Sequence, residues 1–232
     1  MQRIKCRVEE LREYVDTIWH VALTPQQEVS FKPGQYLLVV MSDSDKRPFS
    51  IANSPTRPGV LELQIGATPE NAYAGQVLAR MREQGEIEVE LPAGKAFLRD
   101  ESPRPLILMA GGTGFSYARS ILEYLIDTGS KRPVFFYWGV RQAHWLYELE
   151  QMQQWERDYA PLTFIPVVQE PDADWTGKSG LVHKAIMDDF VSLHDYDIYV
   201  AGRFEMAGAA REEFKILGAE PERIFGDAYE FI

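Results

Sequence analysis

Apolar and polar residues alternate along the first hundred residues. Within residues 60–65 and 86–91, leucine, isoleucine or valine occupies every second position from Leu61 and from Ile87 onward, with glutamate or glutamine between them. A period of two is typical of strands with one buried face and one solvated face. Turn sequences separate these segments, for example Lys32-Pro33-Gly34 and Pro92-Ala93-Gly94. With a single predicted helix at residues 71–82, the pattern predicts a small closed antiparallel β-barrel.

The pattern changes after Pro103-Arg104-Pro105. Residues 106–110 are wholly apolar, which is typical of a strand buried on both faces. Further strand-like segments follow at 134–138, 162–168 and 198–201, and segments of helical period separate them. Strand–helix alternation predicts a parallel sheet covered by helices. We therefore predict two domains: an antiparallel β-barrel over residues 1–101 and an α/β, Rossmann-like nucleotide-binding domain over residues 102–232.

Composition narrows the function classes. The 232 residues carry a net charge of −11, which argues against nucleic acid or an anionic membrane as the main partner. The single cysteine, Cys6, excludes an internal disulfide and a cysteine-ligated iron–sulfur cluster. The four histidines are scattered without metal-ligand spacing, so we expect no metal. Neither a signal peptide nor a membrane span is predicted, and the expected location is the cytoplasm.

A glycine-rich turn, Gly111-Gly112-Thr113-Gly114, separates the predicted strand at 106–110 from a helix. At such a junction the backbone can approach a pyrophosphate, which the helix N-terminus stabilises. A Cβ would block that approach, so glycine is favoured. The usual dinucleotide fingerprint fails, because its third glycine position holds Tyr117. Glycines also occur in turns for steric reasons alone, and both interpretations stay open.

Two other segments have the same ambiguity. Residues 47–52 open a strand in the barrel half, and the alternative to a functional role is an ordinary turn with an exposed arginine. Residues 201–206 form a second glycine-bearing turn at the carboxyl edge of the predicted parallel sheet, where open α/β sheets bind ligands. Gly177-Lys178-Ser179 mimics a P-loop, but Asp172 stands where its first glycine belongs, which excludes that motif.

Taken together, these segments resemble the ferredoxin–NADP reductase superfamily over the whole chain. The closest likeness is to the bacterial NAD(P)H–flavin oxidoreductases of the Fre and LuxG type. Segments in both halves carry the resemblance, and their order and spacing are more specific than any one of them. They are residues 31–36, 47–50, 92–100, 110–120, 137–139, 201–207 and 225–232.

The resemblance implies a flavin-binding barrel followed by a nicotinamide-binding domain, with the site in the cleft between them. Ser50 would hydrogen-bond flavin N5, the atom that receives hydride. Other residues would line the flavin or hold the nucleotide. For the flavin these are Arg47, Pro48, Phe49, Ile65, Gly66 and Ala67. For NADH or NADPH they are Gly111, Gly112, Thr113, Gly114 and Phe115, with Ala201, Gly202 and Met206 at the nicotinamide end.

Departures from the family pattern suggest the subtype. Relatives that keep FAD permanently have a glycine–serine phosphate turn at the start of the barrel helix, and residues 71–77 lack one. The resemblance therefore implies that flavin (riboflavin, FMN or FAD) binds weakly and leaves after reduction. A flavin-dependent oxygenase, a luciferase or ferric complexes would then accept the electrons. Ala201 stands where many relatives have a cysteine, so no thiol chemistry is expected there.

The nucleotide preference is predicted from the second strand of the α/β half. NAD-specific Rossmann sites place a carboxylate after this strand, where it repels a 2′-phosphate. Here the strand is followed by Arg141, and no acid occurs until Glu148. Arg141 suits a 2′-phosphate, or it merely caps a surface loop. Two alternative functions also stay open: a reductase that keeps its flavin and serves a separate redox protein, and a non-enzymatic redox-sensing module.

Overall fold

The computed structural model describes residues 1–69 and 71–232. They form two compact units. The first contains Met1–Leu98 and Arg119–Asp127, and the second contains Arg99–Ala118 and Thr128–Ile232. Helix α2 (Phe115–Asp127) thus contributes its first turn to the second unit and its remainder to the first. The predicted domain boundary between residues 101 and 102 stays a prediction.

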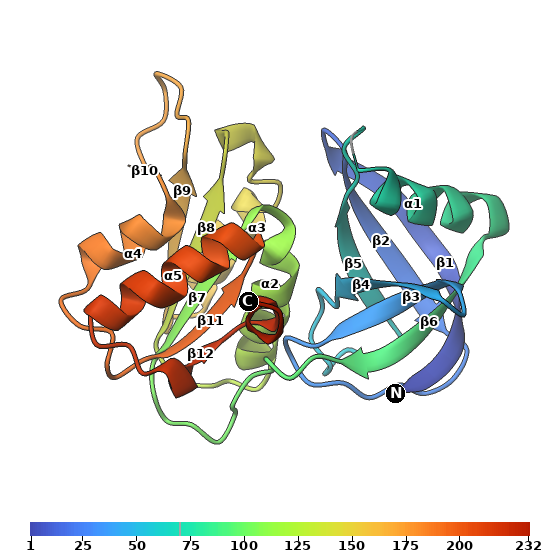
Figure 1. The fold of residues 1–232 in the computed structure, drawn as a ribbon, viewed down its shortest axis with the longest axis horizontal. Helices are drawn as coiled ribbons and strands as arrows, with labels where there is room; N and C mark the ends of the chain where they lie inside the picture. Colours follow the sequence, from blue (N-terminus) through green and yellow to red (C-terminus); the bar gives the residue numbers. More distant parts are fainter. Residues whose placement is uncertain (70) are drawn as a thin grey trace. The chain divides into compact units, whose positions relative to one another are not determined.

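The first unit is built on a six-stranded antiparallel sheet in the order β4-β3-β6-β1-β2-β5. The edge strands β4 and β5 contact each other, and the chain after β4 donates a hydrogen bond from the Ala52 amide to the Glu62 carbonyl at 2.7 Å. These contacts close the sheet into the predicted barrel, and helix α1 covers one end (Figure 1). The elements are β1 (Gln2–Val15), β2 (Ile18–Pro25), β3 (Tyr36–Ser42), β4 (Asp45–Ser50), β5 (Leu61–Gly66), α1 (Ala72–Gln84) and β6 (Glu86–Ala93).

The barrel core comes from the apolar positions of the alternating pattern, among them Val21, Leu63 and Val89. Helix α1 begins where the sequence predicts it, because the side chain of Asn71 accepts a hydrogen bond from the Ala74 amide and caps the first turn. The predicted solvated face of β5 is wrong, since Glu62 and Gln64 are only 8% and 6% exposed. Charged partners from elsewhere in the first unit cover Glu62, as described below.

The second unit contains a six-stranded sheet in the order β10-β9-β8-β7-β11-β12, with every neighbouring pair parallel. This confirms the predicted parallel α/β fold. Helices α4 and α5 contact each other and cross the same face of the sheet (Figure 1). The strands are β7 (Leu106–Gly111), β8 (Val134–Val140), β9 (Leu162–Val168), β10 (Lys178–Ser179), β11 (Asp197–Ala201) and β12 (Ile224–Phe225). The other helices are α3 (Leu149–Asp158), α4 (Val182–Asp189) and α5 (Phe204–Ile216).

The central strands of this sheet are buried on both faces, as their continuous apolar sequences predict. Leu106, Ile107, Leu108, Met109 and Ala110 of β7 are all fully buried. The two-residue strands β10 and β12 lie at the sheet edges, and the sequence pattern does not predict them because two residues show no period. In the described part of the chain, no helix is long and apolar enough to cross a membrane.

Candidate functional site

Ser50 is the last residue of β4, opposite Tyr36 of β3. It lies next to the barrel closure, because the Ile51 amide bonds to the Gln35 carbonyl and the Ala52 amide reaches β5. The Ser50 side chain is half-buried, and its hydroxyl makes no hydrogen bond with the residues that the structure describes. A hydroxyl held on a rigid strand end with its donor free suits a ligand atom at this edge of the barrel.

The predicted flavin-binding residues near Ser50 differ in which of their groups are accessible to a ligand. Pro48 is exposed, and an edge strand such as β4 tolerates a residue without an amide hydrogen. Phe49 is half-buried against the barrel core. The Ile65 side chain points into that core, so only its backbone is free to meet a ligand. The Ala67 amide already bonds to the Thr17 carbonyl, and the Gly66 carbonyl accepts a bond from Asn71.

Arg47 is buried, at 6% exposure, which contradicts the alternative of an exposed arginine in an ordinary turn. Its guanidinium binds both carboxylate oxygens of Asp45, at 2.9 and 2.6 Å. It also donates to the Tyr73 carbonyl at 2.5 Å and to the Gln76 side chain at 2.8 Å. Arg47 therefore fastens β4 to the first two turns of α1.

In the second unit the two predicted nucleotide turns lie side by side. Strands β7 and β11 are parallel neighbours, with Ala110 opposite Ala201. The turn after β7 (Gly111 to Gly114) and the turn after β11 (Gly202) therefore meet at the same carboxyl edge of the sheet. This edge is where open α/β sheets bind ligands, and helix α2 begins there. Tertiary structure thus brings together the predicted nucleotide residues of both turns.

The glycines of these turns have different roles. A Cβ on Gly114 would lie 2.4 Å from the Ala201 carbonyl oxygen, and one on Gly111 would lie 2.6 Å from Met206 Sδ. A Cβ on Gly202 would lie 2.3 Å from Met206 Cε. Gly114 is therefore required by packing against backbone, whereas a Cβ on Gly111 would displace only the flexible end of Met206. Gly202 is favoured also by its φ of +155°. Only Gly112, with φ +54° and no atom within 4 Å of a built Cβ, leaves open room for a ligand beside the turn.

Phe115 contributes to this region by packing. Its side chain is fully buried and stacks on Trp138, with ring centroids 3.9 Å apart. The Trp138 indole donates a 3.0 Å hydrogen bond to the Gly112 carbonyl. The Phe115 ring therefore shapes the turn from inside the protein, and the predicted role of this residue in holding the nucleotide stays a prediction. Thr113, in contrast, is half-exposed.

Arg141 follows β8 directly and is exposed. Backbone pairing continues past the end of the strands, since the Glu170 amide bonds to the Arg141 carbonyl at 2.8 Å. The Arg141 guanidinium then pairs with the Glu170 carboxylate at 2.9 Å. Glu170 was missed because the sequence prediction considered only the residues that follow β8, whereas Glu170 follows β9. The parallel register of the next strand, β9, was the signal that could have found it.

A buried group of charges in the first unit was also missed. Glu62 accepts from Arg119 at 3.2 Å and from Arg57 at 2.8 Å, and it faces His20 at 3.9 Å. Burial would raise the pKa of Glu62, but His20 and the two arginines outweigh it and lower that pKa to about 2. Burial would lower the pKa of His20, but hydrogen bonds to Glu62 and Glu10 raise it above its ordinary value.

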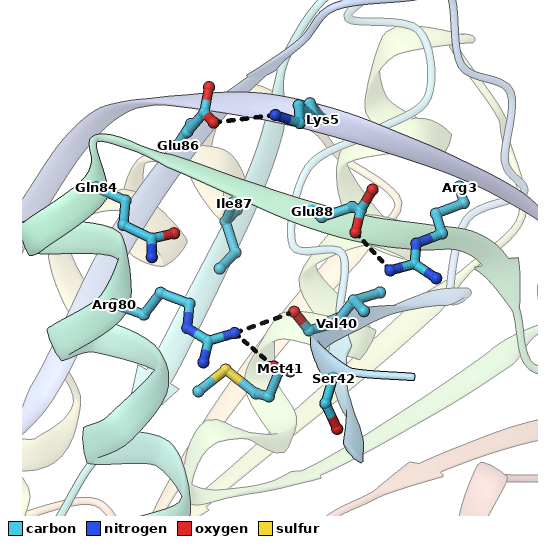
Figure 2. A pocket seen from close by; sticks show the side chains of 10 residues that line it. All are labelled: Arg3, Lys5, Val40, Met41, Ser42, Arg80, Gln84, Glu86, Ile87 and Glu88. Atoms are coloured by element: carbon cyan, nitrogen blue, oxygen red, sulfur yellow. Dashed lines mark hydrogen bonds and ion pairs between the residues drawn. The ribbon is translucent and has the colours of Figure 1, made fainter. Parts of the chain in front are cut away.

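A hollow of about 230 Å³ lies elsewhere on the first unit, and Figure 2 shows its lining. It contains none of the predicted site residues. Its charged groups are already paired: Arg3 with Glu88 at 2.6 Å, and Lys5 with Glu86 at 3.2 Å. Arg80 donates to the Met41 carbonyl at 2.7 Å. We assign no ligand to this hollow. Within residues 1–69 and 71–232, no cluster of three or more histidine, cysteine or acidic side chains could hold a metal ion.

Comparison with known proteins supplies the class. Residues 108–212 match the family model of the oxidoreductase NAD-binding domain. A solved structure, the Amycolatopsis cytochrome P450 reductase GcoB, superposes with a TM-score of 0.87 at 24% identity, covering 97% of this chain and 69% of that chain. At this identity the likeness concerns the fold. A β-barrel followed by a parallel α/β unit is the fold that this chain shares with that reductase.

Closer relatives define the family. The chain is 49% identical to the NAD(P)H-flavin reductase of Vibrio harveyi over 99% of both chains. It is 47% identical to the NAD(P)H-flavin reductase of Aliivibrio fischeri, again over 99% of both chains. The chain belongs to the bacterial NAD(P)H–flavin reductases of the ferredoxin–NADP reductase superfamily. The resemblance found in the sequence is confirmed.

Proposed function

We propose that this enzyme transfers hydride from NADH or NADPH to N5 of a flavin that binds at the end of β4. The observation that carries the proposal is Ser50: a half-buried hydroxyl on a rigid strand, beside the barrel closure, with no protein partner among the described residues. Ser50 donates to the flavin ring where charge is redistributed during reduction. Phe49 supports the ring from the same strand.

The carboxyl edge of the parallel sheet binds the nicotinamide nucleotide in this proposal. Gly112 gives the pyrophosphate an open approach to the backbone, and the start of α2 favours its negative charge. Ala201, Gly202 and Met206 flank the nicotinamide, because the packing of Met206 against Gly111 and Gly202 places these residues beside the same turn. The nicotinamide supplies the hydride, and the protein supplies binding and orientation.

The ribose end of the nucleotide lies at Arg141 and Glu170. The carboxylate of Glu170 neutralises Arg141 and is suited to accept from a 2′-hydroxyl, whereas Arg141 is suited to a 2′-phosphate. Because Arg141 and Glu170 are paired, neither charge acts alone on the ribose. The pair therefore supports use of both NADH and NADPH.

The flavin is proposed to exchange as a substrate. Helix α1 begins with an asparagine cap, and Arg47 already fills hydrogen-bond positions on its first two turns. The reduced flavin would then serve an oxygenase, a luciferase or ferric complexes. We place the reaction in the cytoplasm, which suits a chain whose single cysteine is buried and free.

The test is oxidation of NADH, followed at 340 nm, on adding free flavin to the purified protein. We expect turnover that saturates with riboflavin, FMN or FAD. Binding of both ligands without nucleotide oxidation would instead support a redox-sensing module and contradict the proposal.

A further inference from the structure

Arg47 has little hydrogen-bonding capacity left for a phosphate. Four of its five N–H donors are engaged, two by Asp45 and the others by the Tyr73 carbonyl and Gln76. The Tyr73 ring lies over the guanidinium, with the Arg47 Cζ 4.3 Å from the ring centroid. The hydrogen-bond partners therefore lie around the edge of the guanidinium plane, and the Tyr73 ring covers one of its faces.

The charge of Arg47 is also balanced. The Arg47 guanidinium hydrogen-bonds Asp45 and holds the pKa of that carboxyl below its ordinary value, so the pair is neutral at working pH. The Asp45 side chain is 40% exposed, whereas that of Arg47 is 8% exposed. A phosphate that approached Arg47 would meet the more exposed carboxylate first, and the two anions would repel.

Riboflavin, FMN and FAD share the ring and the ribityl chain. That chain ends in a hydroxyl group in riboflavin, in a phosphate in FMN and in a diphosphate joined to adenosine in FAD. Arginine with free donors is the side chain best suited to bind a phosphate bidentately, and a helix start favours the same charge. Arg47 beside the first turns of α1 combines both features in the flavin-binding unit. Among the residues that the structure describes, Asp45 alone forms an ion pair with Arg47.

We propose that Asp45 is a specificity-determining residue, which lowers the affinity for phosphorylated flavins by keeping the Arg47 guanidinium from their phosphate. The inference rests on the proposed function, because it takes Arg47 to lie at the flavin site. It assigns to Asp45 a role toward the flavin that differs from that of Ser50, since Asp45 acts only on the phosphate.

The test is Asp45→Asn, which keeps the side-chain size and removes the charge. At low ionic strength we expect KM for FMN and FAD to fall about three- to tenfold, because Arg47 gains a charge-assisted bond to phosphate. The KM for riboflavin should stay within about twofold, because riboflavin has no phosphate to gain such a bond. Asp43→Asn is the matched control on the same hairpin, since Asp43 is exposed and pairs with Arg3 at 2.8 Å. It should leave the ratio of the KM values for FMN and riboflavin unchanged.

Equal changes for all three flavins would show that Asp45 merely supports the hairpin and would overturn the proposal. Flavin binding, measured by fluorescence quenching without nucleotide, separates this result from a failure of the proposed function. A protein that binds FMN more tightly after Asp45→Asn supports the role of Asp45 even if no NADH is oxidised. If Asp45→Asn does not fold, the salt dependence of flavin affinity in the wild type tests the inference instead. An FMN affinity that falls steeply with salt, while riboflavin affinity does not, would mean that Arg47 already binds phosphate, and would overturn the inference.

Discussion

A single hydroxyl at the end of β4 carries the proposed chemistry. Ser50→Ala should preserve the fold, because Ser50 is half-buried and its hydroxyl bonds to no described residue. We expect kcat to fall by roughly 10²–10³, as for the loss of one preorganised donor, with little change in KM for NADH. Stopped-flow and steady-state kinetics measure both. Ser44→Ala on the same hairpin is the control, and turnover of Ser50→Ala within about twofold of wild type would leave Ser50 a structural residue only.

Nucleotide preference is also decided by individual side chains. Arg141 and Glu170 form an exposed pair, with 62% and 47% of their side chains accessible, so each contributes modestly. Arg141→Ala should raise KM for NADPH more than KM for NADH. Glu170→Gln should lower KM for NADPH by about two- to fivefold, because the repelling carboxylate is gone.

Glu212→Gln on α5 is the matched control for this pair, since Glu212 is an exposed acid paired with Lys215. The KM series are measured at fixed flavin for both nucleotides. Losses that are equal for NADH and NADPH in Arg141→Ala would remove Arg141 from the 2′-phosphate site. Rejection of NADPH by about a thousandfold in the wild type would contradict dual use altogether.

At the scale of elements, charge pairs inside the first unit link strands to helix. His20 of β2 bonds to Glu10 at 2.6 Å and faces Glu62 of β5. Glu62 is shared with Arg57 and with Arg119 of α2, and Arg119 also donates to the Ala52 carbonyl. A buried charge group of this kind is costly to break on one side only.

This group predicts how stability depends on pH. The raised pKa of His20 means that its contribution is fully present below the unfolded value, near 6.5, and is lost as pH rises through the folded value. The lowered pKa of Glu62, about 2, means that its contribution is lost as pH falls below about 4.5. The pair should therefore stabilise the protein most between about pH 5 and 6.5.

Thermal unfolding at half-unit pH steps tests this expectation. Between pH 6 and 9 the wild-type Tm should fall more steeply than that of His20→Gln, which cannot ionise. His194→Gln is the control, because His194 is exposed and its nearest acid, Glu220, lies 3.4 Å away at the surface. Parallel Tm curves for wild type and His20→Gln would show that His20 contributes no ionisation-dependent stability.

At the scale of the whole molecule, the proposed function gives the enzyme two diffusible ligands, the nicotinamide nucleotide and the flavin. The proposal that flavin is exchanged predicts a nearly colourless purified protein. Absorbance at about 450 nm after gel filtration measures retained flavin, with flavin added in excess beforehand. Stoichiometric flavin that survives this step would instead indicate a reductase that keeps its flavin and serves a separate redox protein.

The sequence determined the features that depend on local period. Strict alternation indicated the barrel strands, continuous apolar segments indicated the parallel sheet, and Asn71 marked the start of α1 to within one residue. The predicted nucleotide turns also lie where two neighbouring strands end, because the carboxyl ends of parallel strands share one edge. These features could be predicted since each one is set by residues a few positions apart.

Tertiary structure alone decided which charged and packed groups meet. Glu62 looks solvated in the sequence and is buried, because Arg119, 57 residues away, pairs with it. Arg47 looks exposed and is enclosed by Asp45 and α1, while Glu170 reaches Arg141 only through the register of β8 and β9. A local period fixes the direction of a side chain, but its partner depends on how distant segments pair. The balance of charge at both proposed ligand sites is therefore a property of the fold.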